Sequence, residues 1–467
     1  MKDSGNEELM QTGQKPSGFA YKILRLFTVV HPGEALTAFL LTLNVFLLLT
    51  AYYILKPIRD ALVVEEWGAE IKLYLNAVSA VLLIFVVKIF SRLASRFPRQ
   101  KLISWVTLFF ISNIGIFYIL HLSGVGPGAM GIAFFIWVGI FNLLVIAQFW
   151  GFANDLYTED EGKRLFPLIA FGAVMGGLAG GIIANWLVDP LGKFQLLLVS
   201  GGILGICILF TWIIHRREIK RAEAKPSKVS KEEKFEKEEH EKPLERGGAF
   251  SLVFKSRYLL YIGFFVLLMN FINTNGVYIL DKVGEIAAAK SIETEFMTKF
   301  YASFYNIQNA FAIFVQLFVV SRVFKWFGVR VAIFILPVLV LGGYFFVSLG
   351  AVLVLVKWVK ALENGTDYSL VNTARHSLFL ITSREEKYKA QAVTKTFFHR
   401  AGDVMAALLV FSCITFLAFF SIENVAMINV VLVLIWIIIC ILIFKEHKKL
   451  SAKKTEYDVE YMKTDQK

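Results

Sequence analysis

The chain has 467 residues, 57% of them hydrophobic, and a formal net charge of +12 at pH 7. Its mean hydropathy is +0.61, and its apolar runs of about 20 residues are each long enough to cross ~30 Å of hydrocarbon. These values exclude an ordinary soluble protein. We expect an all-α polytopic membrane protein with 12 transmembrane helices, about twelve being the number of such runs.

The apolar runs fall into two sets of six. The first set comprises 36–55, 73–90, 102–121, 130–151, 165–188 and 194–214. The second set comprises 258–280, 300–321, 329–348, 351–371, 396–420 and 425–444. A mixed-charge run between them is typical of a solvated cytoplasmic linker. The expected domains are therefore an N-terminal segment, two six-helix bundles joined by the linker, and a tail, with bounds 1–34, 35–214, 215–256, 257–446 and 447–467.

The N-terminal segment does not have the pattern of a cleavable signal peptide. It carries a short amphipathic stretch, GFAYKILRLF, and we expect this stretch to form a helix lying in the membrane interface. Lys and Arg cluster after the second, eighth and twelfth spans, which predicts that both termini and the linker are cytoplasmic. This topology and anionic lipid account for the positive charge without nucleic acid. A bacterial inner membrane is the expected location.

The first apolar run ends in LKPIRD, where Lys56, Arg59 and Asp60 lie within one helical turn. Pro57 lacks a backbone N–H, so we expect it to end or kink the helix there. Two cations and an acid at the end of a span are more than a stop signal requires. This cluster is a candidate binding site.

The fifth run contains GAVMGGLAGG, in which Gly172, Gly176 and Gly180 recur at every fourth position, with Gly177 and Gly181 as a second pair. Small residues at this spacing let two helices approach closely. We interpret the stripe as a packing surface, with a moving contact as the alternative.

Two short matches indicate an internal repeat at an offset of 230 residues. SRLASRFPRQK from position 91 resembles SRVFKWFGVR from position 321, and the sequence GAVM at 172 resembles GDVM at 402. A 6+6 parallel repeat with a cytoplasmic linker suggests the major facilitator architecture, in which the substrate site lies near the membrane midplane between the halves.

Ionisable residues inside the tenth run are costly in a membrane and therefore need a partner or a purpose. Lys360, Glu363 and Asp367 share one helical face, and Lys357 lies about 10 Å deep at 1.5 Å per residue. They predict either a water-filled transport cavity or an internally paired structural face. Arg400 and Asp403 at the start of the eleventh run leave the same two alternatives.

Several signatures are absent from the sequence. There is no G-x-x-x-x-G-K-[ST] motif, so the chain is not expected to drive its own transport as a P-loop ATPase. The seven His and three Cys residues show no metal-ligand spacing, and nothing nominates a catalytic group. We expect no enzyme activity, no metal and no cofactor.

Three stretches together resemble the ATP:ADP antiporter family, the nucleotide transporters of plastids and intracellular bacteria. Where that family reads I-L-R-x-x-K-D-x-L-V-V, this chain reads ILKPIRDALVV from Ile54 to Val64. Both cations are kept, with Lys and Arg exchanged, and so is the acid. Lys56, Arg59 and Asp60 are therefore implied to handle the substrate.

The second stretch, FANDLYTEDEGKRLFPL, is similar to the family motif that follows its fourth helix, and the third runs from Tyr368 to Gly402. The resemblance and the charges of the tenth and eleventh runs together make further residues candidates for the substrate site: Asn154, Asp155, Lys357, Lys360, Glu363, Arg375, Arg400 and Asp403. Candidates for a cytoplasmic motif or gate are Glu161, Lys163, Arg164, Arg384, Lys387 and Lys389.

The chain departs from the family pattern at charged positions. Asp367, Asn372, His376 and Gln391 replace a lysine, an aspartate, a glutamate and a lysine, and INTNGV at 272–277 lacks the family's acid. The resemblance implies an exchanger of nucleotides that works by alternating access as a monomer. One alternative is a carrier of another phosphorylated or organic anion, with proton coupling through Glu363 or Asp367. A second alternative is a non-transporting membrane protein that binds lipid or a partner.

Overall fold

The computed structural model describes most of the chain, namely residues 34–94, 96–97, 99–157, 159–224, 249–382, 384–416 and 421–464. Throughout these residues the regular elements are helices, and no strand occurs among them. The amphipathic stretch expected near the N-terminus and the centre of the linker, 225–248, lie outside the described residues.

Helix α3, Ala35–Ala94, contains the first two expected spans in one element broken at Gly68. Gly68 has φ 81° and ψ 171°, a conformation that glycine adopts without steric cost. The prediction that Pro57 ends the helix was wrong, because Pro57 lies inside the helical segment and the break comes eleven residues later. A kink at Pro57 stays a prediction. Lys56, Arg59 and Asp60 therefore lie within the first helical segment and not at its end.

The rest of the first half consists of α4 (Arg99–Leu122), α5 (Pro127–Leu156), α6 (Glu159–Leu191) and α7 (Lys193–Ala224). The first segment of α3 packs against α5, α6 and α7 and is the central helix of this half. Its buried aliphatic side chains, such as Leu41, Val45 and Leu55, form one core with the aromatic residues of α5. The first ten residues of the expected linker belong to α7.

The second half has more broken helices. It consists of α9 (Ala249–Lys255), α10 (Arg257–Ala288), α11 (Phe296–Phe314), η1 (Val315–Val319), α12 (Val320–Trp326), α13 (Gly328–Leu349), α14 (Leu353–Thr366), η2 (Asp367–Val371), α15 (Asn372–Leu378), η3 (Phe379–Ile381), α16 (Arg384–Val393), η4 (Thr394–Phe398), α17 (His399–Phe416) and α18 (Ile422–Thr464). Helix α10 is central here and packs against α14, α17 and α18. The expected tail continues α18 as far as Thr464.

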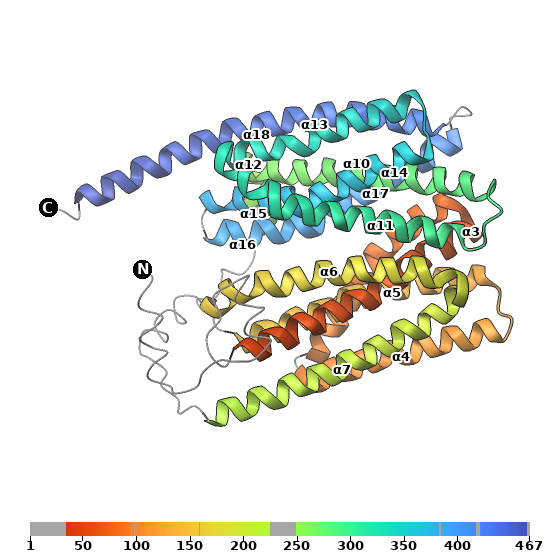
Figure 1. Cartoon of the computed structure of the whole chain (residues 1–467). Helices are drawn as coiled ribbons and strands as arrows, with labels where there is room; N and C mark the ends of the chain where they lie inside the picture. The colour runs from red at the N-terminus through yellow and green to blue at the C-terminus, as the bar shows by residue number, and fades with distance from the viewer. Residues whose placement is uncertain are drawn as a thin grey trace.

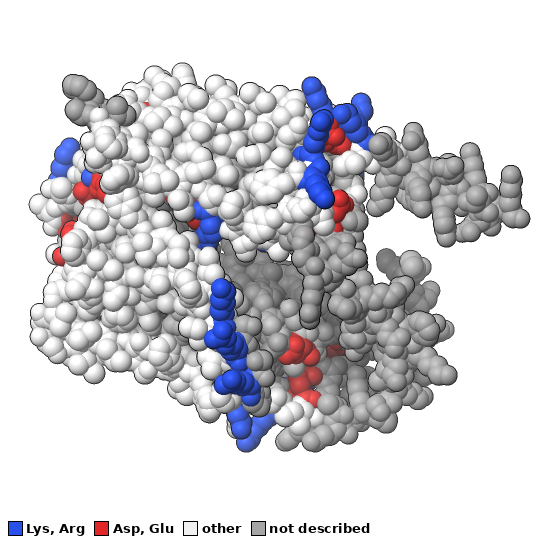
Figure 2. Space-filling model, turned by 180° about the vertical axis from the view of Figure 1, so that it is seen from behind, with Lys and Arg blue, Asp and Glu red and all other residues white. Residues whose placement is uncertain are grey.

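In the described part of the chain, ten helices are long and apolar enough to cross a membrane. The first of these contains the break at Gly68, and the charged segment α14–α15 is not among them. Division at Gly68 and inclusion of α14–α15 would give the expected number, so the count of twelve stays a prediction. Figure 2 agrees with a membrane environment, since charged side chains occupy only a few places on a largely white face.

The proposed repeat has a structural counterpart at Gly172 and Gly402. A Cβ atom on Gly172 would lie 2.8 Å from the carbonyl oxygen of Thr42 in α3. A Cβ on Gly402 would lie 2.7 Å from the carbonyl oxygen of Leu267 in α10. Each glycine thus marks the crossing of the fifth helix of its half over the first, where only a missing side chain allows such close approach.

The glycine stripe in α6 serves two contacts. Gly176 and Gly180 lie against α3, where an added Cβ would be 2.2 Å and 2.4 Å from the carbonyl oxygens of Phe46 and Thr50. Gly181 lies against α11 of the other half, where an added Cβ would meet the Asn306 side chain. The packing interpretation is therefore correct within the first half, and the second glycine pair lies at the contact between the halves.

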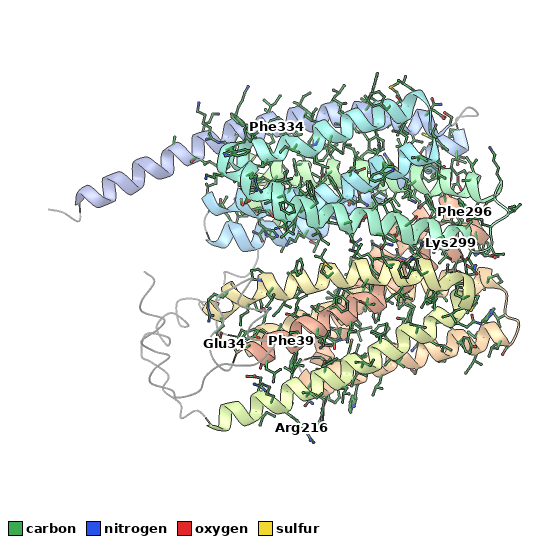
Figure 3. The ribbon with its side chains drawn as sticks, viewed as in Figure 1. Glu34, Phe39, Arg216, Phe296, Lys299 and Phe334 are labelled. Carbon is green, nitrogen blue, oxygen red and sulfur yellow. The ribbon has the colours of Figure 1, made fainter. Side chains whose placement is uncertain are left out.

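The two halves are tied together at the end of the bundle that contains Gly68, at the right of Figure 1. Lys282 of α10 lies 2.9 Å from Glu70 of α3, and Glu285 of α10 accepts a hydrogen bond from the backbone N–H of Ala69. Lys299, labelled at this end in Figure 3, lies 2.7 Å from Asp189 of α6. At the opposite end, where Figure 3 labels Glu34, the ribbons of the two halves diverge.

Candidate substrate cavity

A cavity of about 280 Å³ lies between the two halves. It is next to the end of the bundle where Gly68 lies and where the ion pairs described above join the halves. Its walls come from both segments of α3 and from α10, α11, α14, η2 and α17. Five of the predicted substrate-site residues line it, namely Lys56, Arg59, Asp60, Arg400 and Asp403, and so does Asp367. The structure thus brings residues that are more than 300 positions apart to one cavity.

Lys56 is half-buried and surrounded by aromatic rings. Its Nζ lies 3.9 Å from the ring centre of Tyr305, 5.1 Å from that of Tyr53 and 5.9 Å from that of Tyr52. A cation over ring faces is attracted by the ring quadrupoles. Among the described residues no carboxylate lies within ion-pair distance of Lys56. Lys56 is therefore a cation that is held in place without being neutralised.

Arg59 and Asp60 form a second unit that connects the halves. The Arg59 guanidinium donates to Oδ1 of Asp60 through Nε at 2.9 Å and Nη2 at 2.7 Å. The other carboxylate oxygen of Asp60 accepts a hydrogen bond of 2.5 Å from the hydroxyl of Tyr305 in α11. Asp60 is fully buried, so these donors replace the water it would otherwise bind.

Lys72 and Asp281 belong to the same network, although the sequence analysis did not select them. Lys72 Nζ lies 2.7 Å from Asp281 Oδ1 and 3.7 Å from Asp60 Oδ1. The hydroxyl of Tyr301 donates to the same Asp281 oxygen at 2.7 Å. Both residues were missed because the expected spans began at 73 and ended at 280, one position short of each charge, whereas the helices extend past them.

Arg400 and Asp403 lie on the wall formed by α17. Arg400 Nη1 is 3.3 Å from Asp403 Oδ2, while Asp403 Oδ1 accepts hydrogen bonds from Asn270 Nδ2 at 2.7 Å and from the Thr274 hydroxyl at 2.8 Å. Asp403 is thus anchored to α10 by two donors, whereas Arg400 is exposed and, among the described residues, forms an ion pair with this carboxylate alone. Arg375 lies 3.7 Å from Asp367 Oδ1.

Lys360 and Glu363 do not line the cavity. Lys360 Nζ lies 3.0 Å from Glu363 Oε1 and donates to the backbone and side-chain oxygens of Asn273 at 2.8 and 2.6 Å. Glu363 Oε2 in turn accepts a hydrogen bond of 2.7 Å from the hydroxyl of Tyr344. Since an ammonium group has three donors, this arrangement uses all of them. The geometry favours the structural alternative for this pair.

The other predicted residues whose side chains the structure describes are not among those that line the cavity. Lys357 donates to the Ser303 hydroxyl at 2.5 Å where α14 packs against α11, and it is not among the residues that line the cavity. Asn154 and Asp155 are exposed at the C-terminal end of α5. Arg164 is 3.3 Å from Glu34 at the same end of the bundle, near Glu161 in α6. The side chains of Lys163, Arg384, Lys387 and Lys389 lie outside the described part of the chain.

The charges lining the cavity balance. Four cations (Lys56, Arg59, Lys72 and Arg400) face four acids (Asp60, Asp281, Asp367 and Asp403), with His399 beside them. Across the described residues no group of three or more His, Cys, Asp and Glu side chains is placed to hold a metal ion. Apart from Lys56, the charged residues that line the cavity are held in ion pairs.

Solved structures with a similar backbone are transporters. A POT family transporter in complex with 5-aminolevulinic acid superposes with a TM-score of 0.61 at 14% identity, covering 88% of this chain and 96% of that one. The nucleoside transporter NupG gives a TM-score of 0.59 at 13% identity, covering 89% and 98%. At this identity the likeness establishes the fold, which is of the major facilitator type.

Relatives in sequence are more specific. "ADP,ATP carrier protein 5" of Rickettsia felis is 25% identical over 93% of this chain and 98% of the relative. "ADP,ATP carrier protein 1" of Chlamydia muridarum is 24% identical over 86% and 85%. The model of the TLC ATP/ADP transporter family matches residues 14–122 and 132–448, which is most of the chain. The resemblance seen in the sequence motifs is confirmed, and the chain belongs to the TLC ATP/ADP transporter family.

Proposed function

We propose that this protein exchanges nucleotides across a membrane by alternating access, with the phosphates bound in the central cavity. Lys56 carries the proposal. It lines a cavity between the halves, its position is held by three tyrosine rings, and no described acid neutralises it. An ammonium group held in this way is suited to a phosphate, which it would bind with a charge-assisted hydrogen bond.

The balanced charges supply a reason for coupling. A phosphate chain with several negative charges can gain more than one cation only by displacing acids that now hold Arg59 and Arg400. Asp60 and Asp403 would then rely on Tyr305, Asn270 and Thr274, which already donate to them. In an empty carrier Arg59 and Arg400 are locked to acids, which resists reorientation and favours obligatory exchange.

The conformation fits one step of such a cycle. The cavity is closed off on the Gly68 side by the Lys72–Asp281 and Lys282–Glu70 ion pairs, while the halves diverge towards the side where α3 begins and α18 ends (Figure 1). With both termini cytoplasmic, as we propose from the distribution of Lys and Arg, this state faces inward. We place the protein in a bacterial inner membrane, among anionic lipids and as a monomer.

Counter-exchange in proteoliposomes tests the proposal. Purified protein is reconstituted into vesicles loaded with unlabelled ADP, and uptake of labelled ATP is followed. Rapid uptake that requires internal nucleotide is expected. Absence of uptake for every nucleoside di- and triphosphate pair tried would refute nucleotide exchange.

A matched panel separates this function from transport of another anion. Vesicles loaded with a hexose phosphate or a dicarboxylate, with and without a pH gradient, should support little uptake of labelled ATP. If such vesicles exchanged their contents for the same external anion, and nucleotide did not compete, the cavity would belong to a different anion carrier.

A further inference from the structure

A second, mainly apolar pocket of about 510 Å³ lies beside the central cavity, between α6 of the first half and α11 of the second. Its walls are aliphatic and small side chains, chiefly Leu49, Ala173, Val174, Ala312, Ile313 and Leu317. The pocket adjoins the point at which the two helices touch, because Gly177 and Asn309 both line it and an added Cβ on Gly177 would lie 3.1 Å from Asn309 Nδ2.

Two π-helical segments border this pocket. Gln316 and Leu317 come from η1, while Tyr368 and Ser369 come from η2, and η1 and η2 lie in contact with each other. A π-helical turn is locally unfavourable and occurs often at functional sites, where it redirects side chains. The two π-helical segments, η1 and η2, therefore both contribute residues to the wall of this pocket.

The pocket also holds a buried donor for which the described part of the chain supplies no acceptor. Asn309 is 5% exposed, and its Nδ2 makes no hydrogen bond, while its Oδ1 accepts from the Tyr53 hydroxyl at 3.4 Å. A buried N–H without an acceptor is destabilising, so such a group in a pocket indicates a ligand with an acceptor. Apolar walls with a small number of placed polar groups are typical of a small-molecule binding site.

Two tyrosines connect this pocket to the cationic cavity. Tyr368 lines both spaces, and Tyr53 lines the pocket while its ring centre lies 5.1 Å from Lys56 Nζ. A ligand with an anionic end at Lys56 and an aromatic end in the pocket would therefore lie next to both tyrosines. No described residue in the pocket lining is charged.

We propose that the apolar pocket binds the base of a nucleotide whose phosphates lie at Lys56 in the central cavity. Asn309 Nδ2 donates to a ring nitrogen or carbonyl of the base, and Tyr53 and Tyr368 offer ring faces for stacking. This inference rests on the proposed function, and it adds that recognition depends on the base as well as on the phosphates. A lipid chain would fill the apolar walls but leave Asn309 without an acceptor.

Binding of ATP and of inorganic tripolyphosphate to the purified protein tests this assignment, because the two share phosphates and differ in the base. The first variant is Ala173→Leu, which fills the pocket from α6. Its matched control is Ala133→Leu, at an exposed position of α5. Affinities are measured by calorimetry, and melting temperatures show whether each variant is folded.

We expect the wild type and Ala133→Leu to bind ATP about tenfold or more tightly than tripolyphosphate, a difference within the range of base stacking. In Ala173→Leu this preference should disappear while tripolyphosphate affinity stays unchanged. Equal affinity for both probes in the wild type, or an unchanged preference in Ala173→Leu, would overturn the pocket assignment and leave the phosphate site intact. Binding of neither probe by the wild type would instead refute the proposed function.

A second pair of variants guards against misfolding of Ala173→Leu. Asn309→Ser removes the unmatched donor, and Asn306→Ser changes the neighbouring amide at Gly181, which does not line the pocket. Only Asn309→Ser should reduce the preference for ATP. An equal effect of both variants would show that these amides act in helix packing, and release of a copurifying phospholipid by Ala173→Leu, with ATP affinity unchanged, would assign the pocket to lipid.

Discussion

The charges of α3 and those of α14 look alike in the sequence but occupy different environments. Lys56, Arg59 and Asp60 face the cavity, and Asp60 is bonded to Tyr305 of the opposite half. Lys360 and Glu363 lie behind the cavity wall and are satisfied by Asn273 and Tyr344 of their own half. What separates the two groups of intramembrane charges is therefore whether they line the cavity and which half supplies their partners.

The largest effect on stability is expected from breaking the α14 pair on one side. Lys360→Met removes the cation and leaves Glu363 buried at 4% exposure beside Tyr344. An uncompensated buried charge costs about 3–5 kcal/mol, so the melting temperature should fall sharply. The double variant Lys360→Met with Glu363→Leu should recover most of the loss. A single variant that melted like the wild type would contradict the structural role given to this pair.

The largest effect on transport is expected at Lys56. Lys56→Gln keeps a polar side chain of similar length but removes the charge that has no described acid partner. Loss of one charge-assisted contact of about 1.5–3 kcal/mol weakens binding roughly 10- to 150-fold. The melting temperature should change little, because no ion pair is broken. Labelled nucleotide exchange and thermal unfolding of the same sample measure both quantities.

Lys56→Arg is the control for charge at this position. It should retain more binding than Lys56→Gln, and a result in which the two variants behaved alike would show that the ammonium charge is not what binds the substrate.

A smaller effect, on the balance between the two conformations, is expected from removing a hydrogen bond between the two halves, and none from removing a hydrogen bond within one half. Tyr305→Phe deletes the hydroxyl that donates to Asp60 across the interface, and Tyr344→Phe deletes the one that donates to Glu363 within the second half. Each change removes about 1–2 kcal/mol. Only Tyr305→Phe should shift the population towards opening on the Gly68 side, by about 5- to 30-fold.

Thiol labelling measures this shift. A cysteine introduced at Val277, which lines the cavity, would be labelled from the outer side in a background where the three native cysteines are replaced. Faster labelling is expected with Tyr305→Phe and unchanged labelling with Tyr344→Phe. Equal acceleration by both would mean that the Asp60–Tyr305 contact has no special part in closing the cavity.

The fold was largely predictable from the sequence because a membrane limits the choices. Apolar length predicted helices close to those observed, and the glycines at 172 and 402 predicted two equivalent crossings that the structure contains. Pro57 was misleading because proline is tolerated within membrane helices, where neighbouring groups satisfy the freed carbonyl. The helix breaks at Gly68 because of the backbone conformation of this residue. The number and spacing of apolar residues do not predict that conformation.

The cavity was predictable only in part. Motif position identified Lys56, Arg59 and Asp60, and charge within apolar runs identified Arg400 and Asp403. Lys72 and Asp281 were missed because a hydropathy pattern ends a span at the first charge, whereas two opposite charges from different helices stabilise each other inside the bundle. The tyrosines that surround Lys56 were missed because aromatic residues are common throughout the chain.

The smallest effect is expected at Lys357, and it tests whether the charges of α14 lie outside the substrate site. Lys357 is a half-buried cation whose Nζ donates to Ser303, outside the cavity lining. Lys357→Met keeps the apolar stem that packs along the helix and removes one hydrogen bond to a neutral hydroxyl, so its cost should stay near 1 kcal/mol. The KM for nucleotide should change less than about threefold, against a far larger change for Lys56→Met in the same assay. Were both variants equally impaired, the cavity would have to extend along the contact between α11 and α14 as far as Lys357 during the cycle, and the distinction between α3 and α14 would hold only for this conformation.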